Sequence, residues 1–420
     1  MRTFYSAMWY LALPLVLLRL WWRGMKEPGY RQHWRERLGI YRERVPGWHT
    51  IWVHAVSVGE TRAAEPLIDA LVEAYPDSRI LLTHMTPTGR ATGKALFAKH
   101  GERLIQAYLP YDTVAMVNRF IRQFTPRICI LMETEVWPNL IAACGERIPV
   151  ALVNARLSER SLRRGQRFGQ LMTDAGRGIA LVAAQTEADA ARLRSFGASK
   201  VEVTGSIKFD VVVPEAALAT GAWLRARIGA RPVLLCASTR DGEEALILDA
   251  FKRMVWPQGA PLLMIVPRHP QRFDDVAAQV LERGLSLQRR SGLAQQGVDA
   301  DVLLGDSMGE MFAYYAACDV AFVGGSLLPL GGQNLIEPCA LGKPVLVGPH
   351  TFNFALATED AIADGGALRV PDAAALLSEA ARLLGDPEAR AGMGAHAAAY
   401  AQRHRGATAR TVGLLRRLIY

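Results

Sequence analysis

The chain has 420 residues, of which 50% are hydrophobic and 21% are charged. This composition excludes a disordered chain, and the length favours two domains over one. The net charge of +9 permits nucleic acid, a membrane surface or an acidic substrate as a partner, so the position of the basic residues has to decide between them.

Residues 3–22 form the most apolar stretch of the chain and contain no acidic residue and a single base, Arg19. Their length matches the ~20 residues that cross a bilayer core, and Trp and Tyr residues stand near both ends. We therefore expect residues 1–24 to be a membrane-anchor helix. Pro14 and Arg19 leave open whether it spans the bilayer or lies in the interface, and a buried core helix is the alternative.

The basic residues lie beside this apolar stretch. Residues 1–48 carry nine Lys and Arg against three Glu, which gives a net charge of +6. This pattern places the rest of the chain on the cytoplasmic side of a membrane and makes a nucleic-acid partner unnecessary. The five cysteines are scattered and form no C-x-x-C pair, which argues against a zinc ribbon or a disulfide framework and favours a reducing cytosol.

From residue 50 onward, short apolar runs alternate with amphipathic segments, which predicts an α/β protein with mostly parallel sheets. Predicted strands of the first half are 51–56, 80–83, 106–109, 128–132, 150–154 and 181–184. Those of the second half are 233–237, 262–266, 302–304, 320–323 and 344–347. Each half therefore reads as a doubly wound, Rossmann-like domain.

The domain boundary is expected near Pro214, where the sequence loses its periodicity. We predict an N-terminal domain over 25–210, a linker over 211–222 and a C-terminal domain over 223–420. The Ala- and Arg-rich segment 388–418 is predicted to be one helix, which we expect to pack back on the N-terminal domain.

In such folds, ligands bind at the carboxyl ends of the strands, so the loops there are the candidate sites. Glu60 ends the first such loop, HAVSVGE (54–60), at the start of a helix. A carboxylate there can cap the helix or accept a proton from an attacking hydroxyl. The helix N-terminus lowers its pKa and a desolvated site raises it, and the sequence does not decide between them.

Two further loops of the first half carry charged candidates. METEVWPN (132–139) places Glu133 and Glu135 after a strand, where either can also serve the next helix, and two carboxylates at this spacing do not define a glycosidase. Lys208, in TGSIKFD (204–210), can neutralise an anionic group.

The second half carries candidates for phosphate binding. Arg268 and His269 stand between two prolines after a strand, and an arginine fork suits a phosphate. Glycines at 324–325 and 331–332 precede a short helix, where backbone N–H groups can approach a phosphate. Segment 307–311 is a helix start that can contact a nucleotide. Asp299-Ala300-Asp301 precedes its strand on the far end, so no metal site is expected.

Together, these motifs resemble the 3-deoxy-D-manno-octulosonic acid (Kdo) transferases of lipopolysaccharide synthesis. The resemblance extends over essentially the whole chain and rests on HAVSVGE, MTPTG, LPYD, METEVWPNLI, NARLS, TGSIKFD, VPRHP, MGEM, FVGGSL, GGQNLIEP and GPHTFNF. It implies a GT-B fold, in which two Rossmann-like domains face a central cleft. It also implies transfer of Kdo from the donor CMP-Kdo to a lipid A precursor, with inversion and without a metal or other cofactor.

The resemblance also assigns roles to residues. Glu60 falls on the family's catalytic base, and Glu133 and Lys208 fall on its transition-state stabilisers. The expected contacts to the donor nucleotide are Arg268, His269, Met308, Gly309, Glu310, Asn334, Leu335, Ile336 and Glu337. Arg156 is a candidate for the Kdo carboxylate. The alternatives are a membrane-associated GT-B transferase that uses a UDP-sugar and a non-catalytic, membrane-tethered nucleotide-binding protein.

Overall fold

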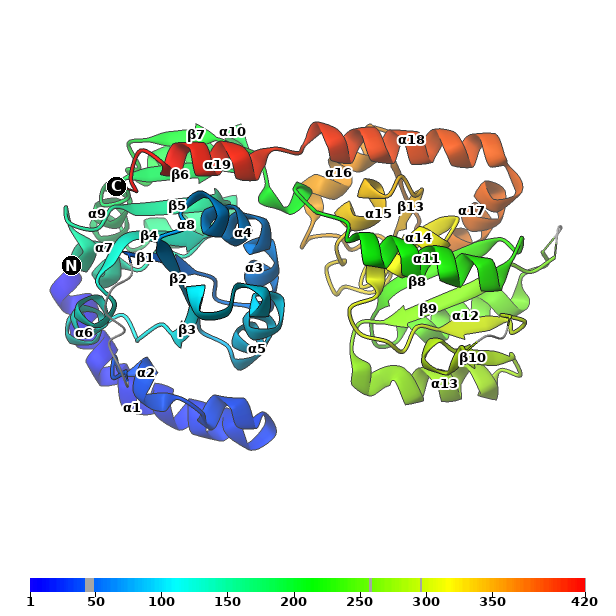
Figure 1. The fold of residues 1–420 in the computed structure, drawn as a ribbon, viewed down its shortest axis with the longest axis horizontal. Coiled ribbons are helices and arrows are strands. Elements are labelled where there is room, and N and C mark those ends of the chain that lie inside the picture. Colours follow the sequence, from blue (N-terminus) through cyan, green and yellow to red (C-terminus); the bar gives the residue numbers. More distant parts are fainter. Residues whose placement is uncertain (42–48, 257–258, 295–296, 420) are drawn as a thin grey trace. The chain divides into compact units, whose positions relative to one another are not determined.

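The computed structural model describes residues 1–41, 49–256, 259–294 and 297–419. The chain divides into two compact units (Figure 1). Unit 1 comprises residues 1–210 together with the stretch from 405 to the C-terminus, and unit 2 comprises residues 211–404.

Unit 1 is built on a seven-stranded parallel sheet with the strand order β3-β2-β1-β4-β5-β6-β7. Its strands are β1 His49–His54, β2 Ser78–His84, β3 Leu104–Tyr108, β4 Pro126–Met132, β5 Val150–Ala155, β6 Leu181–Ala184 and β7 Val201–Val203. Six of them confirm the predicted strands. β7 was missed because it is a three-residue edge strand with two exposed side chains and no apolar run.

Helices cover both faces of this sheet. Side chains alternate along β1, so Trp52 faces the apolar layer that includes Phe120 and Leu140, while Ile51 and Val53 face the opposite layer. The helices of unit 1 are α1 Arg2–Lys26, α2 Trp34–Arg37, α3 Val58–Ala63, α4 Glu65–Ala74, α5 Pro87–Leu96, α6 Val114–Phe124, α7 Pro138–Cys144, α8 Glu159–Gln166, α9 Gln170–Arg177, α10 Glu187–Ser195 and α19 Ala407–Leu415.

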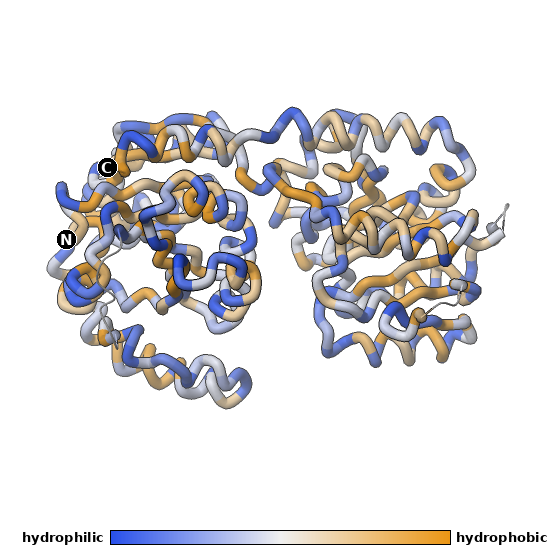
Figure 2. Tube along the Cα trace, in the orientation of Figure 1, coloured by the Kyte–Doolittle hydropathy of each residue, from blue (hydrophilic) through white to orange (hydrophobic). Residues whose placement is uncertain are grey.

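Unit 2 repeats the architecture with the order β10-β11-β9-β8-β12-β13-β14, again all parallel. Its strands are β8 Val233–Thr239, β9 Leu262–Pro267, β10 Leu287–Arg289, β11 Val302–Leu304, β12 Val320–Val323, β13 Val345–Val347 and β14 Ala367–Arg369. β10 and β14, the two edge strands, were not predicted. Figure 2 shows mostly hydrophobic strands in both units.

The helices of unit 2 complete its two layers. They are α11 Glu215–Ile228, α12 Glu243–Arg253, α13 Phe273–Glu282, α14 Met311–Ala317, α15 Ile336–Ala340, α16 Ala355–Ala363, α17 Ala373–Gly385 and α18 Pro387–Arg403. The expected linker 211–222 is wrong from residue 215 onward. Helix α11 begins there and packs on α14, with Gly221 allowing close approach to Ala313 and Ala316.

The predicted single helix over 388–418 is also wrong. Helix α18 ends at Arg403, and Gly406 adopts a left-handed φ of 89° before α19 begins. Helix α19 belongs to unit 1, where it packs on α4, and the Asp210 carboxylate accepts hydrogen bonds from the backbone N–H groups of Gly406 and Thr408. The C-terminal unit is therefore residues 211–404 and not 223–420.

Candidate active site

Each sheet has one position where consecutive crossovers leave in opposite directions along the sheet. In unit 1 this topological switch lies between β1 and β4, and in unit 2 it lies between β8 and β12. Ligands of doubly wound proteins bind in the crevice at the carboxyl ends of these two strands. Glu60 follows β1 and Glu133 follows β4, so both lie at the switch of unit 1.

Glu60 lies in the first turn of α3, and its carboxylate is folded back onto its own loop. It accepts hydrogen bonds from the Val56 N–H at 2.8 Å and from the Ser57 hydroxyl at 3.1 Å. Burial raises the pKa of Glu60 to about 7; the Val56 N–H opposes this shift, and the charges of Glu135 and Glu133 add to it. The competition that the sequence left open is decided in favour of desolvation.

Glu133 forms an ion pair with Lys208, with 2.8 Å between its Oε1 and the lysine Nζ. Both side chains are largely buried, at 14% and 23% exposed. The backbone of Glu133 has a left-handed φ of 56°, which costs a non-glycine residue about 1–2 kcal/mol. Such a conformation persists where the surrounding structure holds it, here through its N–H to the Val153 carbonyl at 3.0 Å.

Asn154 positions the lysine loop and was not found by sequence analysis. It is fully buried at the end of β5, with a φ of 50°, and its Oδ1 accepts the backbone N–H of Ile207 at 3.1 Å. Ile207 begins the 3-10 helix Ile207–Phe209 that carries Lys208. An asparagine after a strand tolerates this backbone conformation, but the sequence did not show which loop its side chain would hold.

Glu135 differs from Glu133 in its surroundings. Its carboxylate accepts the indole N–H of Trp137 at 2.9 Å. Burial raises the pKa of Glu135; the Trp137 hydrogen bond opposes this shift and the charge of Glu133 reinforces it. The charge of Glu135 thus helps to raise the pKa of Glu60, but Glu135 is not part of the Glu133–Lys208 ion pair.

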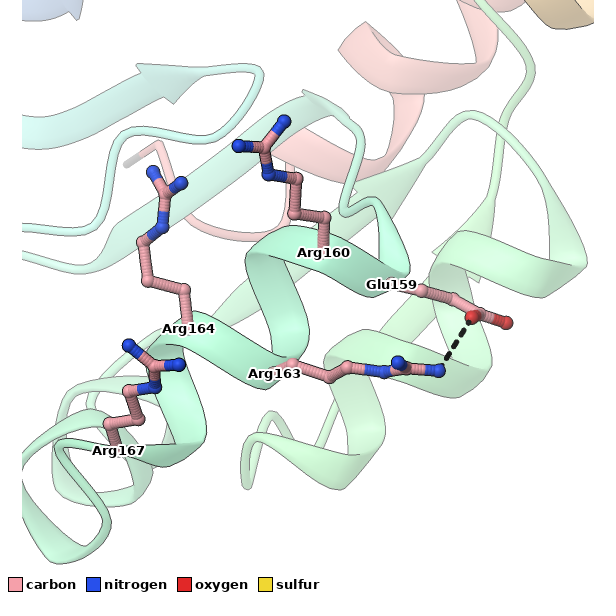
Figure 3. A pocket seen from close by; sticks show the side chains of 5 residues that line it. All are labelled: Glu159, Arg160, Arg163, Arg164 and Arg167. Atoms are coloured by element: carbon pink, nitrogen blue, oxygen red, sulfur yellow. Dashed lines mark ion pairs between the residues drawn. The ribbon is translucent and has the colours of Figure 1, made fainter.

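A group of arginines follows β5 at the same edge of unit 1. Arg156 is exposed just beyond the strand, and α8 begins three residues later. A hollow of about 580 Å³ is lined by Glu159, Arg160, Arg163, Arg164 and Arg167. Arg163 extends to its ion-pair partner Glu159, whereas Arg160 and Arg164 extend to another side of the helix (Figure 3). Apart from Arg156, sequence analysis singled out none of these arginines.

At the topological switch of unit 2 lies a buried carboxylate, Glu243, that accepts hydrogen bonds from backbone N–H groups. It is fully buried and accepts N–H groups of Arg240 at 2.8 Å, Gly325 at 2.6 Å and Leu327 at 2.9 Å. The glycine turn after β12 needs its glycines, because a Cβ on Gly324 would lie 2.6 Å from the Thr239 Cα. Gly325 has a φ of 70°.

The predicted cationic residues follow β9. Partial burial lowers the pKa of His269, and the charges of Arg240, Arg268 and Arg272 lower it further, which favours the neutral imidazole. Arg272 is engaged by the fully buried Glu244 at 3.2 Å and by Asp241. The guanidinium groups of Arg240, Arg268 and Arg272 therefore lie near His269 at this edge, and Arg272 is paired with Glu244 and Asp241.

The remaining predicted contacts lie after β11 and β12. Met308 is 60% exposed, Gly309 has a φ of 83°, and Glu310 pairs with Arg290 at 2.9 Å. Asn334 accepts the Ile336 N–H at 3.0 Å and donates to Glu337 at 3.1 Å. The side chains of Leu335 and Ile336 are both 1% exposed, so only their backbones can meet a ligand.

All of the predicted site residues therefore lie at the carboxyl edge of one of the two sheets. The structure brings Glu60, Glu133 and Lys208 together in unit 1, and it gathers the predicted nucleotide contacts at one edge of unit 2. Within the described ranges, no group of three His, Cys, Asp or Glu side chains is placed to hold a metal ion.

The fold is that of GT-B proteins. A UDP-GlcNAc 2-epimerase from Neisseria meningitidis, solved with UDP-GlcNAc bound, superposes with a TM-score of 0.59 over 88% of this chain and 100% of its own, at 17% identity. At that identity the likeness concerns the fold alone.

Sequence comparison is more specific. Residues 32–211 match the family described as 3-deoxy-D-manno-octulosonic-acid transferase (kdotransferase). The chain is 49% identical to the 3-deoxy-D-manno-octulosonic acid transferase of Bordetella pertussis over 96% of both chains. It is 37% identical to that of Haemophilus influenzae over 99% of this chain and 98% of the relative. The chain belongs to the Kdo transferase family and is a glycosyltransferase of lipopolysaccharide synthesis.

Proposed function

We propose that this protein transfers Kdo from CMP-Kdo to a lipid A precursor, the tetraacyldisaccharide 4′-phosphate, with inversion and release of CMP. The reaction takes place at the cytoplasmic face of the inner membrane and needs no metal ion. The observation that carries this proposal is the carboxyl edge of the unit 1 sheet, where Glu60, a carboxylate with a pKa of about 7, lies beside the Glu133–Lys208 ion pair.

Glu60 is the proposed base. In its ionised form it accepts the proton of an acceptor hydroxyl, and that oxygen attacks the anomeric carbon of Kdo. The bond from this carbon to the phosphate oxygen breaks, and its electron pair leaves with CMP. A pKa near 7 suits this role because about half of the carboxyl groups are ionised at neutral pH while they remain basic enough to take the proton.

Lys208 and Glu133 are the proposed transition-state stabilisers. Negative charge moves to the departing phosphate, and Lys208 is the cation that the crevice of unit 1 holds in a fixed position through Glu133. Arg156 is proposed for the carboxylate of Kdo itself, since an arginine fork accepts a carboxylate through two parallel hydrogen bonds.

Unit 2 is the proposed CMP-binding unit. Arg268 and His269 meet the phosphate, the backbones of Met308, Gly309 and Glu310 and the stretch from Asn334 to Ile336 contact the nucleotide, and Glu337 accepts from ribose hydroxyls. The nearby buried carboxylates are engaged within the protein, Glu243 by three backbone N–H groups and Glu244 by Thr239 and Arg272. This supports charge neutralisation by cationic side chains in place of a metal ion.

The test is incubation of the purified protein with CMP-Kdo and the tetraacyldisaccharide 4′-phosphate in the presence of EDTA, followed by mass analysis. A product heavier by one or more Kdo residues, together with free CMP, is expected. An unchanged acceptor would overturn the acceptor assignment, and activity that returns only with added Mg²⁺ would overturn metal independence.

Nucleotide selectivity provides a second test. CMP is expected to raise the melting temperature more than UMP or UDP at equal concentration, because binding to the folded state stabilises it. A larger shift with UDP would favour a transferase that uses a UDP-sugar.

A further inference from the structure

Helix α1 presents two different faces. Among the described residues, its side chains at positions 5, 6, 9, 12, 13, 16, 17 and 20 are partly covered, and Gly24 is buried. The opposite face carries an uninterrupted apolar stripe in which every side chain is at least 53% exposed: Phe4, Met8, Leu11, Leu15, Leu18, Trp22 and Met25. Spacings of three and four residues place these seven side chains on one side of the helix, over a length of about 32 Å.

The N-terminal end of α1 is fastened to unit 1. The Tyr5 hydroxyl donates to the Asp112 carboxylate at 3.0 Å, and the Ser6 hydroxyl bonds the Asn139 side chain. The ring of Trp9 packs on Tyr111 with 5.7 Å between centroids. Asp112 is only 1% exposed and also accepts hydrogen bonds from the backbone N–H groups of Asn139 and Leu140. The Tyr5 hydroxyl therefore bonds to a carboxylate that is fixed in the interior of unit 1.

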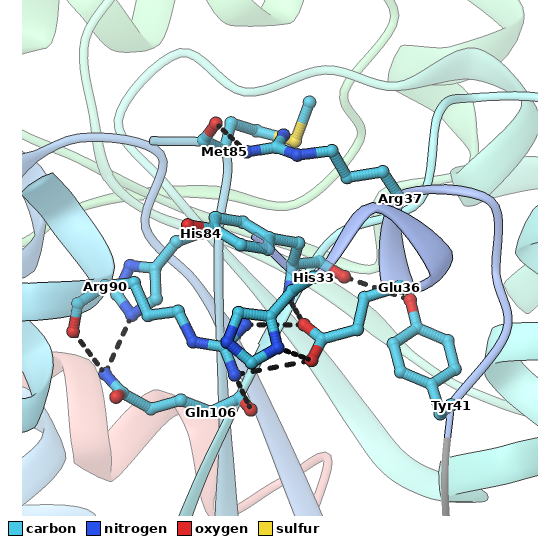
Figure 4. A network of polar contacts seen from close by, with 9 residues as sticks. His33, Glu36, Arg37, Tyr41, His84, Met85, Arg90 and Gln106 are labelled. Carbon is cyan, nitrogen blue, oxygen red and sulfur yellow. Dashed lines mark hydrogen bonds and ion pairs between the residues drawn. The ribbon is translucent and has the colours of Figure 1, made fainter. Parts of the chain in front are cut away.

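The segment that follows α1 is fastened as well (Figure 4). Glu36 accepts from Arg90 at 2.6 Å, from the Tyr108 N–H at 2.8 Å and lies 3.0 Å from His33. Arg37 is 1% exposed, lies 3.9 Å above the Tyr108 ring centroid and donates to the Met85 carbonyl at 3.1 Å. The N-terminal end of α1 and the segment that follows α1 are thus both held on unit 1.

These contacts conflict with a helix that crosses a bilayer. If residues 3–22 spanned the membrane, Tyr5 would lie about 25 Å from the end of the span that joins the domain. Its bond to the buried Asp112 and the packing of Trp9 on Tyr111 would then be lost. A bilayer surface instead accommodates the stripe while the contacts of the covered face are kept.

Charge identifies the surface. Helix α1 contains Arg2, Arg19, Arg23 and Lys26 and no acidic residue. Arg23 lies 4.3 Å over the Tyr30 ring and Arg31 5.0 Å over the Trp21 ring, a basic and aromatic combination that suits the headgroup region of an anionic bilayer.

We infer that α1 is an interfacial helix: it lies in the plane of an anionic bilayer, with the stripe from Phe4 to Met25 immersed and the covered face on unit 1. This inference deepens the proposed membrane location and does not depend on the identity of the donor or of the acceptor.

Depth measurement tests the orientation. Phe4 and Leu11 are replaced one at a time by cysteine and labelled with a nitroxide; the five native cysteines are buried and do not compete. In vesicles of phosphatidylethanolamine and phosphatidylglycerol, both labels are expected at the same depth below the headgroups. A difference of about 10 Å between these positions, seven residues apart, would show a spanning helix and overturn the inference.

Vesicle flotation tests the stripe. The double variant Leu11→Asp/Leu15→Asp is expected to lower the partition coefficient at least about tenfold, with an unchanged melting temperature because both side chains are exposed. The control is Val255→Asp, at an 85% exposed apolar residue of unit 2, which should leave binding unchanged. The inference would be contradicted if the double variant floated with the vesicles as the parent protein does. It would also be contradicted if the parent protein formed a stable dimer that the double variant does not form. Transfer to a soluble, deacylated acceptor is measured in parallel, so loss of the proposed reaction is seen separately.

Discussion

The switch positions of the two units have the same topology, but their buried carboxylates are engaged differently. In unit 1, Glu60, Glu133 and Glu135 lie close together. Burial, together with the charges of Glu135 and Glu133, raises the pKa of Glu60 to about 7. In unit 2, the corresponding carboxylate, Glu243, is satisfied by three backbone N–H groups. One fold thus holds the proposed base in one unit and a glycine turn in the other, and the difference lies in the hydrogen bonds that each carboxylate accepts.

The largest expected effect follows removal of the base. Glu60→Gln should lower kcat about 10²–10⁴-fold, because no carboxylate then accepts the acceptor proton, while the affinity for CMP, measured by calorimetry, stays unchanged. Glu73→Gln, at an exposed glutamate on α4, is the matched control. Transfer by Glu60→Gln at the parental rate would remove Glu60 from the mechanism.

The counterpart in unit 2 is Glu243→Ala, for which we expect a loss of stability and not of chemistry. Three buried N–H groups lose their acceptor, which should lower the free energy of unfolding by about 3 kcal/mol and weaken CMP binding through the displaced glycine turn. Denaturant unfolding with and without CMP measures both effects. A variant of parental stability would contradict the structural role of Glu243.

The pH dependence sharpens the contrast. Because the pKa of Glu60 is raised to about 7, its ionised fraction falls as pH falls, and kcat/KM should decrease about tenfold per pH unit below 7. The folded protein holds this proton where the unfolded chain has lost it, so the contribution of Glu60 to stability decreases as pH rises towards 7. The assay covers roughly pH 5, about two units below the pKa, to roughly pH 8, about one unit above it. A flat rate profile over this range would be inconsistent with Glu60 as the base.

The smallest expected effect concerns the arginines of α8. Arg160→Gln/Arg164→Gln should raise the acceptor KM a few-fold to about tenfold, because these exposed side chains can meet an acceptor phosphate, and added salt should reduce the difference. Arg163→Gln removes a charge from the same helix but from the side that pairs with Glu159, and should leave KM unchanged. Equal effects of both changes would argue against a directed phosphate contact.

The sequence predicted those parts of the fold that have a strong local pattern. Long apolar runs such as 128–132 bury both faces and stand out, whereas the edge strand Leu287–Arg289 is three residues of mixed polarity whose pairing depends on β11. The break at Gly406 was missed because the helix-favouring composition on both sides outweighs one glycine.

The candidate site was predicted to the extent that it lies in loops after strands. Glu60 and Lys208 follow that rule, but the ion pair of Lys208 with Glu133 joins residues 75 positions apart and has no local signal. Glu243 was overlooked because an acidic residue at a helix start is ordinarily a surface cap. Its three backbone partners become visible only when β8 and β12 lie side by side.

Helix α19 gives unit 1 a discontinuous chain. Ala407, Val412 and Leu415 are buried in the same apolar layer as Leu67 and Ile207. During synthesis, this layer stays incomplete until residues 407–415 have left the ribosome, although its other members were made first. Unit 2, residues 211–404, can close earlier, so the unit whose synthesis begins first finishes folding last.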